Sequence, residues 1–102
     1  MVEFHSLNLH DAHITNIGLC WESGCLTIEA SVFIDGLQKP AIFCKLCWTN
    51  LHKLFIPREF PWGPSSFIHS HQFVPPGQYE IEMQSGDTLL IEADKFELIP
   101  YP

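Results

Sequence analysis

Apolar and polar residues alternate with a period of two along much of the chain, a pattern typical of half-buried β-strands. The clearest run extends from Cys25 to Asp35. Its apolar members, expected to share one face, are Leu26, Ile28, Ala30, Val32 and Ile34. Residues 17–21 alternate in the same way before Ser23-Gly24, so we expect a hairpin here. A two-residue Ser23-Gly24 turn would pair Trp21 with Leu26.

A second hairpin is predicted over residues 78–93. Tyr79, Ile81 and Met83 are expected to point inward, and the polar residues between them outward. A three-residue Ser85-Gly86-Asp87 loop would pair Met83 with Leu89 and Tyr79 with Ala93, and would place Glu80 opposite Glu92. Beyond Asp94 the apolar phase shifts to Phe96 and Leu98, which indicates a bulge or bend between residues 93 and 95.

The rest of the chain predicts two more strands, separated by turns and one long loop. We expect a turn at Asp35-Gly36 and strands from Ala41 to Trp48 and from Phe67 to Phe73. Apolar residues at helical spacing over 50–55 predict one short helical turn, and the proline-rich stretch 57–64 predicts a loop. The predicted fold is therefore all-β: a single-domain antiparallel β-sandwich or small barrel spanning residues 1–102.

Composition narrows the range of partners. The 102 residues suit one domain, and their net charge of −7 argues against nucleic acid or an anionic membrane as a partner. A basic protein partner remains compatible with that charge. The amino-terminal residues lack the basic and apolar regions of a signal peptide, and no apolar run approaches the length of a membrane span. With four cysteines expected to be reduced, we expect a cytoplasmic protein.

Two histidine clusters are candidate metal ligands. His10, Asp11 and His13 lie within four residues, although His10 and His13 would point to opposite faces of a strand. His69 and His71 would share one face of a strand, at a spacing that suits chelation of zinc or another divalent transition metal. Packing roles are the alternative for both clusters, and the metal interpretation depends on the clusters meeting in space.

The four cysteines favour packing over chemistry. Cys44 and Cys47 have CxxC spacing but lie in a strand pattern, whereas a redox motif requires a helix amino terminus. Cys20 and Cys25 are expected to be diagonal neighbours on the outer face, too far apart for a disulfide. We therefore expect buried, inert thiols in the CxxC motif and no zinc site built from these four residues.

Two features suggest a binding surface. The outward face of the second hairpin carries Glu80, Glu82 and Glu92, which form either a solvated face or a docking surface for a basic protein. Trp62 lies in a stiff loop between prolines, where it either closes one end of the fold or anchors an interface. No hydrolase, phosphate-binding, dinucleotide-binding or zinc-protease motif is present, so nothing in the sequence supports nucleophilic catalysis, and a binding protein is favoured over an enzyme.

Three segments together carry a resemblance to known families. These are His10-Asp11-Ala12, Pro61-Trp62-Gly63-Pro64-Ser65 and the hairpin from Tyr79 to Asp87. They resemble small uncharacterised bacterial β-domain families, some of which are similar to immunity proteins of polymorphic toxin systems. The resemblance implies no catalytic residue. The leading hypothesis is a non-catalytic protein-binding module, with a metal-dependent enzyme or sensor and a homo-oligomeric domain as alternatives.

Overall fold

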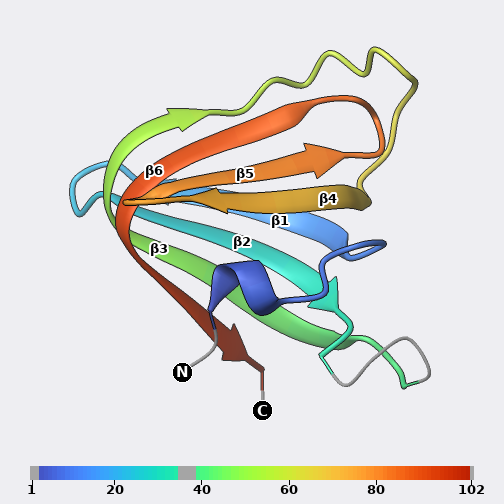
Figure 1. Cartoon of the computed structure of the whole chain (residues 1–102), viewed down its shortest axis with the longest axis horizontal. Coiled ribbons are helices and arrows are strands. Elements are labelled where there is room, and N and C mark those ends of the chain that lie inside the picture. The colour runs from blue at the N-terminus through green and yellow to red at the C-terminus, as the bar shows by residue number, and fades with distance from the viewer. Residues whose placement is uncertain (1–2, 35–38, 102) are drawn as a thin grey trace.

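Six strands make up almost all of the regular structure in the computed structural model, which describes residues 3–34 and 39–101. A short 3-10 turn, η1 (Phe4–Ser6), precedes them (Figure 1). The strands are β1 (His13–Cys20), β2 (Cys25–Val32), β3 (Ile42–Phe55), β4 (Ile68–Val74), β5 (Gln78–Met83) and β6 (Thr88–Pro100). They form one sheet in the order β1-β2-β3-β6-β5-β4, with every neighbouring pair antiparallel. The predicted all-β class is confirmed.

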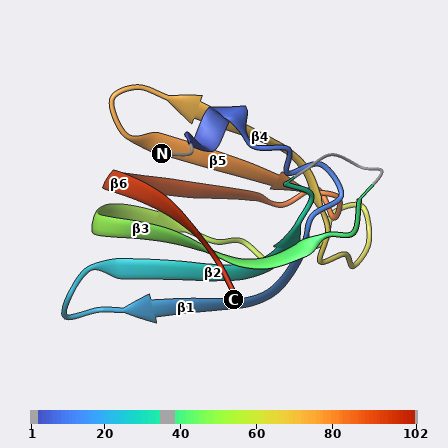
Figure 2. The same ribbon diagram turned by 90° about the horizontal axis from the view of Figure 1, so that it is seen from below.

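The sheet is rolled, so that its two edge strands approach each other at one end (Figure 2). There His13 and Phe67 form an isolated antiparallel bridge. The amide of Asp11 donates to the Ile68 carbonyl at 2.8 Å, and that of Ile14 donates to the Ser66 carbonyl at 2.9 Å. Residues 11–14 and 66–68 therefore close one end of the sheet into a half-closed barrel.

The core lies on the concave face of the rolled sheet. Buried and half-buried residues alternate strictly along β2 and β5, as the period of two requires. The largest fully buried side chains of the sheet are Trp48, Leu26, Ile28, Leu46, Ile68, Ile81, Ile91 and Val32. Phe4, Leu9 and Ala12 from the amino-terminal segment cover this face and are also buried.

Both hairpins occur where the sequence predicts them, but both predicted registers are wrong by two residues. In the first, Leu19 rather than Trp21 faces Leu26, and the loop has four residues. In the second, Ile81 rather than Met83 faces Leu89. A shift of two leaves every side chain on its expected face, so hydrophobic alternation cannot detect it.

The helical turn predicted over residues 50–55 is wrong, because β3 continues through them. Asn50 has a φ of 54°, a conformation that asparagine tolerates well, and the pairing with β6 shifts between Leu51 and Lys53. This bulge turns both Leu51 and Leu54 toward the core, which imitates helical spacing in the sequence. The predicted change of phase in β6 is confirmed, since Ala93 and Phe96 both pack on the core.

The remaining predictions concern β4, the proline-rich loop and one turn. The strand predicted over 67–73 is β4, and the proline-rich stretch is an irregular loop between β3 and β4. The turn predicted at Asp35-Gly36 lies outside the described residues. Within the described part of the chain, no helix is long and apolar enough to cross a membrane.

Candidate functional site

The loop of residues 57–66 holds Trp62 against the tip of the β5–β6 hairpin. The Trp62 amide donates to the Ser85 carbonyl at 2.9 Å. Its ring lies over Gly86, where an added Cβ would approach the ring and Pro61 to 2.8 Å. Even so, Trp62 is 70% exposed. One side of the indole is fixed on the hairpin while the rest faces solvent, so Trp62 does not close an end of the fold.

A buried carboxylate, Asp87, fixes the path of this loop. It accepts hydrogen bonds from the amides of Glu59 (2.9 Å) and Phe60 (3.0 Å) and from the Ser85 hydroxyl (2.8 Å). Burial by itself raises the pKa of Asp87, but these donors and the charge of Arg58 outweigh it and hold the pKa below its ordinary value. Sequence reasoning placed Asp87 only in a turn. Its role as an anchor depends on a loop almost thirty residues earlier in the chain.

Glu80, Glu82 and Glu92, which we call the acidic strip, lie half-buried on the convex face of the same hairpin. Glu80 was expected opposite Glu92, and this is wrong: Glu80 faces Leu90, and Glu92 faces Gln78. Like charges are therefore not directly opposed across the strands. This arrangement lowers the electrostatic repulsion between the three glutamates.

Each glutamate of the strip has a neighbour that moderates its charge. The Gln78 side-chain amide donates to Glu80 at 2.7 Å, and the Lys53 ammonium lies 3.9 Å from Glu92. Glu82 lies 2.8 Å from the His69 ring and accepts a hydrogen bond from the Ser70 hydroxyl. These pairs leave other carboxylate lone pairs free, because each oxygen can accept more than one hydrogen bond.

The β5–β6 hairpin therefore presents both candidate contact features. Glu82 pairs with Thr88 in the last ladder step before the turn, and Trp62 lies on that turn. The anchors that hold Trp62, Ser85 and Asp87, belong to the same turn and are buried. An aromatic group at the tip is thus rigidly connected to carboxylates along one face.

The structure brings one histidine from each cluster together. The His10 and His69 rings are 5.9 Å apart, and His10 Nδ1 lies 2.7 Å from the His69 carbonyl oxygen. Asp11 is close to them, with its carboxylate 3.6 Å from His10 Nε2 and hydrogen-bonded to the Gln84 side-chain amide. Closure of the sheet by residues 11–14 and 66–68 produces this meeting.

The other two histidines point elsewhere. His13 stacks on Phe67 at 4.6 Å, and His71 meets Phe4 edge-on at 5.1 Å. The expected shared face of His69 and His71 is wrong, because a bulge between Ile68 and Ser70 turns His69 outward and His71 toward the core. Among residues 3–34 and 39–101, no three His, Cys, Asp or Glu side chains are placed to hold a metal ion.

All four cysteines are free thiols. Cys44 is buried and Cys47 half-buried on the opposite face, so the CxxC spacing does not bring the two thiols together. Burial raises the pKa of both. Cys20 lies directly opposite Cys25 rather than diagonal to it, a correction that follows from the register of the hairpin. Hydrogen bonds from Ser23 lower the pKa of the exposed Cys20 thiol.

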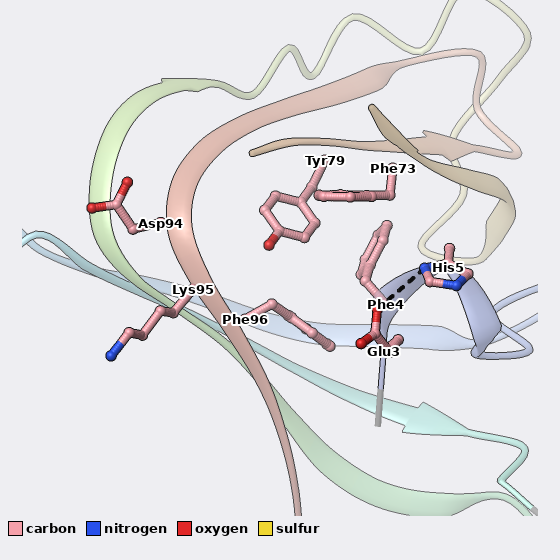
Figure 3. A pocket seen from close by; sticks show the side chains of 8 residues that line it. All are labelled: Glu3, Phe4, His5, Phe73, Tyr79, Asp94, Lys95 and Phe96. Atoms are coloured by element: carbon pink, nitrogen blue, oxygen red, sulfur yellow. Dashed lines mark ion pairs between the residues drawn. The ribbon is translucent and has the colours of Figure 1, made fainter. Parts of the chain in front are cut away.

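A cleft of about 410 Å³ opens where η1 meets the sheet (Figure 3). The rings of Phe4, Phe73, Tyr79 and Phe96 gather there, whereas Asp94 and Lys95 lie to one side on β6. Phe4 lies 5.1 Å from Tyr79 and 5.2 Å from Phe96, both edge-on. Burial and the charge of Glu3 raise the pKa of Tyr79, so its hydroxyl stays protonated. These rings contact one another as a packed core does.

The chain is thus a small all-β protein with a half-closed barrel and one prominent aromatic loop. No protein-family model, curated protein or solved structure matches it. Its function must accordingly be inferred from its own residues.

Proposed function

We propose that this chain is a non-catalytic, cytoplasmic protein-binding module of bacterial origin that engages a basic protein through Trp62 and the acidic strip. Its most specific form is an immunity-type inhibitor of a basic toxin. The observation that carries the proposal is Trp62: a large aromatic side chain that is 70% exposed and yet held in place from beneath.

Rigid exposed aromatics suit binding because they bury a large area at a small cost in conformational entropy. Trp62 is held by Gly86 and by the backbone of Ser85, and Asp87 holds the residues before it. A partner that covers the indole would thus meet a preorganised loop. Tryptophan is among the residues that most often dominate binding energy at interfaces.

The acidic strip would attract a basic partner electrostatically. Its three carboxylates lie on one convex face of a chain with a net charge of −7. Such a field accelerates encounter with a basic partner and disfavours acidic ones. Most of this contribution acts on the rate of association, so it should weaken as salt is added.

The test is capture by the immobilised full chain from a panel of purified basic proteins and from a bacterial extract. Four forms are compared: wild type, Trp62→Ala, Glu80→Lys/Glu92→Lys and the control Glu22→Lys/Glu97→Lys. The control changes net charge by the same amount at exposed sites outside the strip. We expect a partner that wild type and control retain and that the other two forms lose.

Affinity for any captured partner should then fall more than tenfold with Trp62→Ala, as expected for an interface hot spot. The proposal fails if no protein depends on both Trp62 and the strip. It also fails if strip reversal leaves affinity unchanged at low salt.

A second candidate is a divalent transition-metal site at His10, His69 and Asp11, which lie near one another but are not placed around one point, so their side chains would have to move to share an ion. The test is thermal unfolding of EDTA-treated protein with and without Zn²⁺, Mn²⁺, Ni²⁺ or Ca²⁺. A metal at about 100 times its Kd would add about 2.7 kcal/mol, or several degrees in Tm. A rise lost in both His10→Ala and His69→Ala would establish the site, and no rise with any metal would remove it.

A further inference from the structure

β1 has a free edge along most of its length. Its pairing with residues 66–68 ends at Ile14, and from Thr15 to Cys20 the described residues supply no partner strand on that side. Alternate residues of an edge strand direct their N–H and C=O groups away from the sheet, ready to pair with another strand. The rolled sheet thus remains open along this edge.

Apolar side chains are exposed beside this edge. Ile17 is 37% exposed, Leu19 is 44% exposed and Trp21, in the following turn, is 88% exposed. Ile17 also lines a cleft of about 150 Å³, together with Ile14 and with Phe60 of the proline-rich loop. The core-facing side of β1 is therefore only partly covered by its own chain.

Beyond the bulge between Ile14 and Asn16, this edge lacks the charges and prolines that commonly protect edge strands. Residues 12–21 contain no Asp, Glu, Lys, Arg or Pro. The nearest charged residues lie just outside this stretch, at Asp11 and Glu22. Natural edge strands are usually protected by charges, prolines or covering segments. Elsewhere the chain carries a strong negative charge.

We propose that this edge pairs with the same edge of a second copy, so that two rolled sheets join through β1 about a two-fold axis. Antiparallel pairing centred on Gly18 places Ile17 opposite Leu19 of the second copy, and Leu19 opposite its Ile17. Trp21 then lies across from Thr15, at the bulge of β1, and the pairing ends before Ile14, whose amide is already bonded to the Ser66 carbonyl. No like charges oppose each other in this register, and the exposed apolar residues cover one another.

Charge favours a second copy over a basic partner at this surface. Because this edge carries no charge, a basic strand would gain no electrostatic attraction from it. Two chains that each carry a net charge of −7 repel one another, so they approach most easily at a surface without charged groups. The expected salt dependence follows from this. Screening relieves repulsion between the copies, so dimerisation should strengthen as salt is added, while capture of a basic protein by the acidic strip should weaken.

The test is sedimentation velocity of the full chain at increasing concentrations up to about 1 mM, at low and at high salt. An interface of one short strand lies below the size of standard stable interfaces, so we expect a weak, reversible dimer. Leu19→Lys and Ile17→Lys should each raise the dimer Kd at least tenfold. Ile99→Lys is the matched control, a similarly exposed isoleucine on β6 that should leave the Kd unchanged.

Hydrogen exchange locates the contact independently of the variants. Amides in residues 15–20 should exchange more slowly as concentration rises, while those of the acidic strip should not change. Circular dichroism checks that each variant is folded. A chain that remains monomeric, a dimer that tolerates both lysines, or protection that appears elsewhere would each overturn the proposal, and none of these outcomes bears on Trp62.

Discussion

At the scale of single residues, His71 combines a polar ring with an apolar setting. Its Nε2 atom is buried without a hydrogen-bond partner, and its ring packs against the buried Phe4. Burial lowers the pKa of His71 from its usual value of 6.5, although a hydrogen bond with the Phe4 backbone opposes the change. The folded chain therefore favours the neutral imidazole.

This setting predicts a loss of stability in mild acid. Since the folded pKa is lowered, the unfolded chain binds the proton more readily. Stability should be full above about pH 6.5, fall as pH drops toward the lowered folded pKa, and level off below it. Urea unfolding between pH 7.5 and 5 measures this, and His71→Phe should flatten the slope. His69→Gln, which changes an exposed histidine, should retain it; an identical slope in His71→Phe would contradict this account.

At the scale of elements, the β5–β6 turn organises a loop that is distant in sequence. Asp87 receives three donors, and Gly86 has a φ of 92° with the Trp62 ring directly against it. A side chain at position 86 would be strained by the backbone and would displace the indole. The turn thus fixes the position of the aromatic loop.

Two substitutions test whether the turn holds the loop. Asp87→Asn replaces an acceptor oxygen with an amide group, which leaves a backbone amide of the loop without its partner; Tm should fall by several degrees. Gly86→Ala should displace Trp62 and quicken proteolysis within residues 57–66. Glu97→Gln, an exposed acidic residue on β6, is the control for Asp87→Asn. Unchanged Tm and proteolysis in both variants would show that the turn does not hold the loop.

At the scale of the whole molecule, the amino-terminal segment covers the concave face of the rolled sheet. Phe4 is 3% exposed and contacts the rings of Trp48, His71, Tyr79 and Phe96. These partners come from β3, β4, β5 and β6. One side chain near the start of the chain therefore ties four strands together.

Removal of that side chain should be costly. Phe4→Ala is expected to lower the free energy of unfolding by about 3–5 kcal/mol, because it removes buried area and leaves a cavity. Denaturant unfolding measures the loss. His5→Ala, which truncates an exposed neighbour, should change it by less than about 0.5 kcal/mol. If Phe4→Ala lost no more than the control, the amino-terminal segment would not be part of the core.

The candidate sites show which residue positions could be predicted from the sequence. The sequence predicts Trp62 in a stiff loop and the acidic strip on an outward face; the structure leaves Trp62 70% exposed and the three glutamates half-buried, and their role in contact stays a prediction. Asp87 was missed because its donors are distant in sequence. The histidine clusters could not be evaluated, since closure of the sheet joins His10 to His69 and a bulge separates His71 from them.

The sequence alone determined the strand class, the position of both hairpins and the face on which most strand residues lie. Those features follow from an alternation that repeats locally every two residues. Tertiary structure decided the registers, the bulges in β3 and β4, the closure of residues 11–14 on 66–68 and the free edge of β1. The physical reason is that alternation is unchanged by a shift of two, whereas register and closure depend on packing between distant segments.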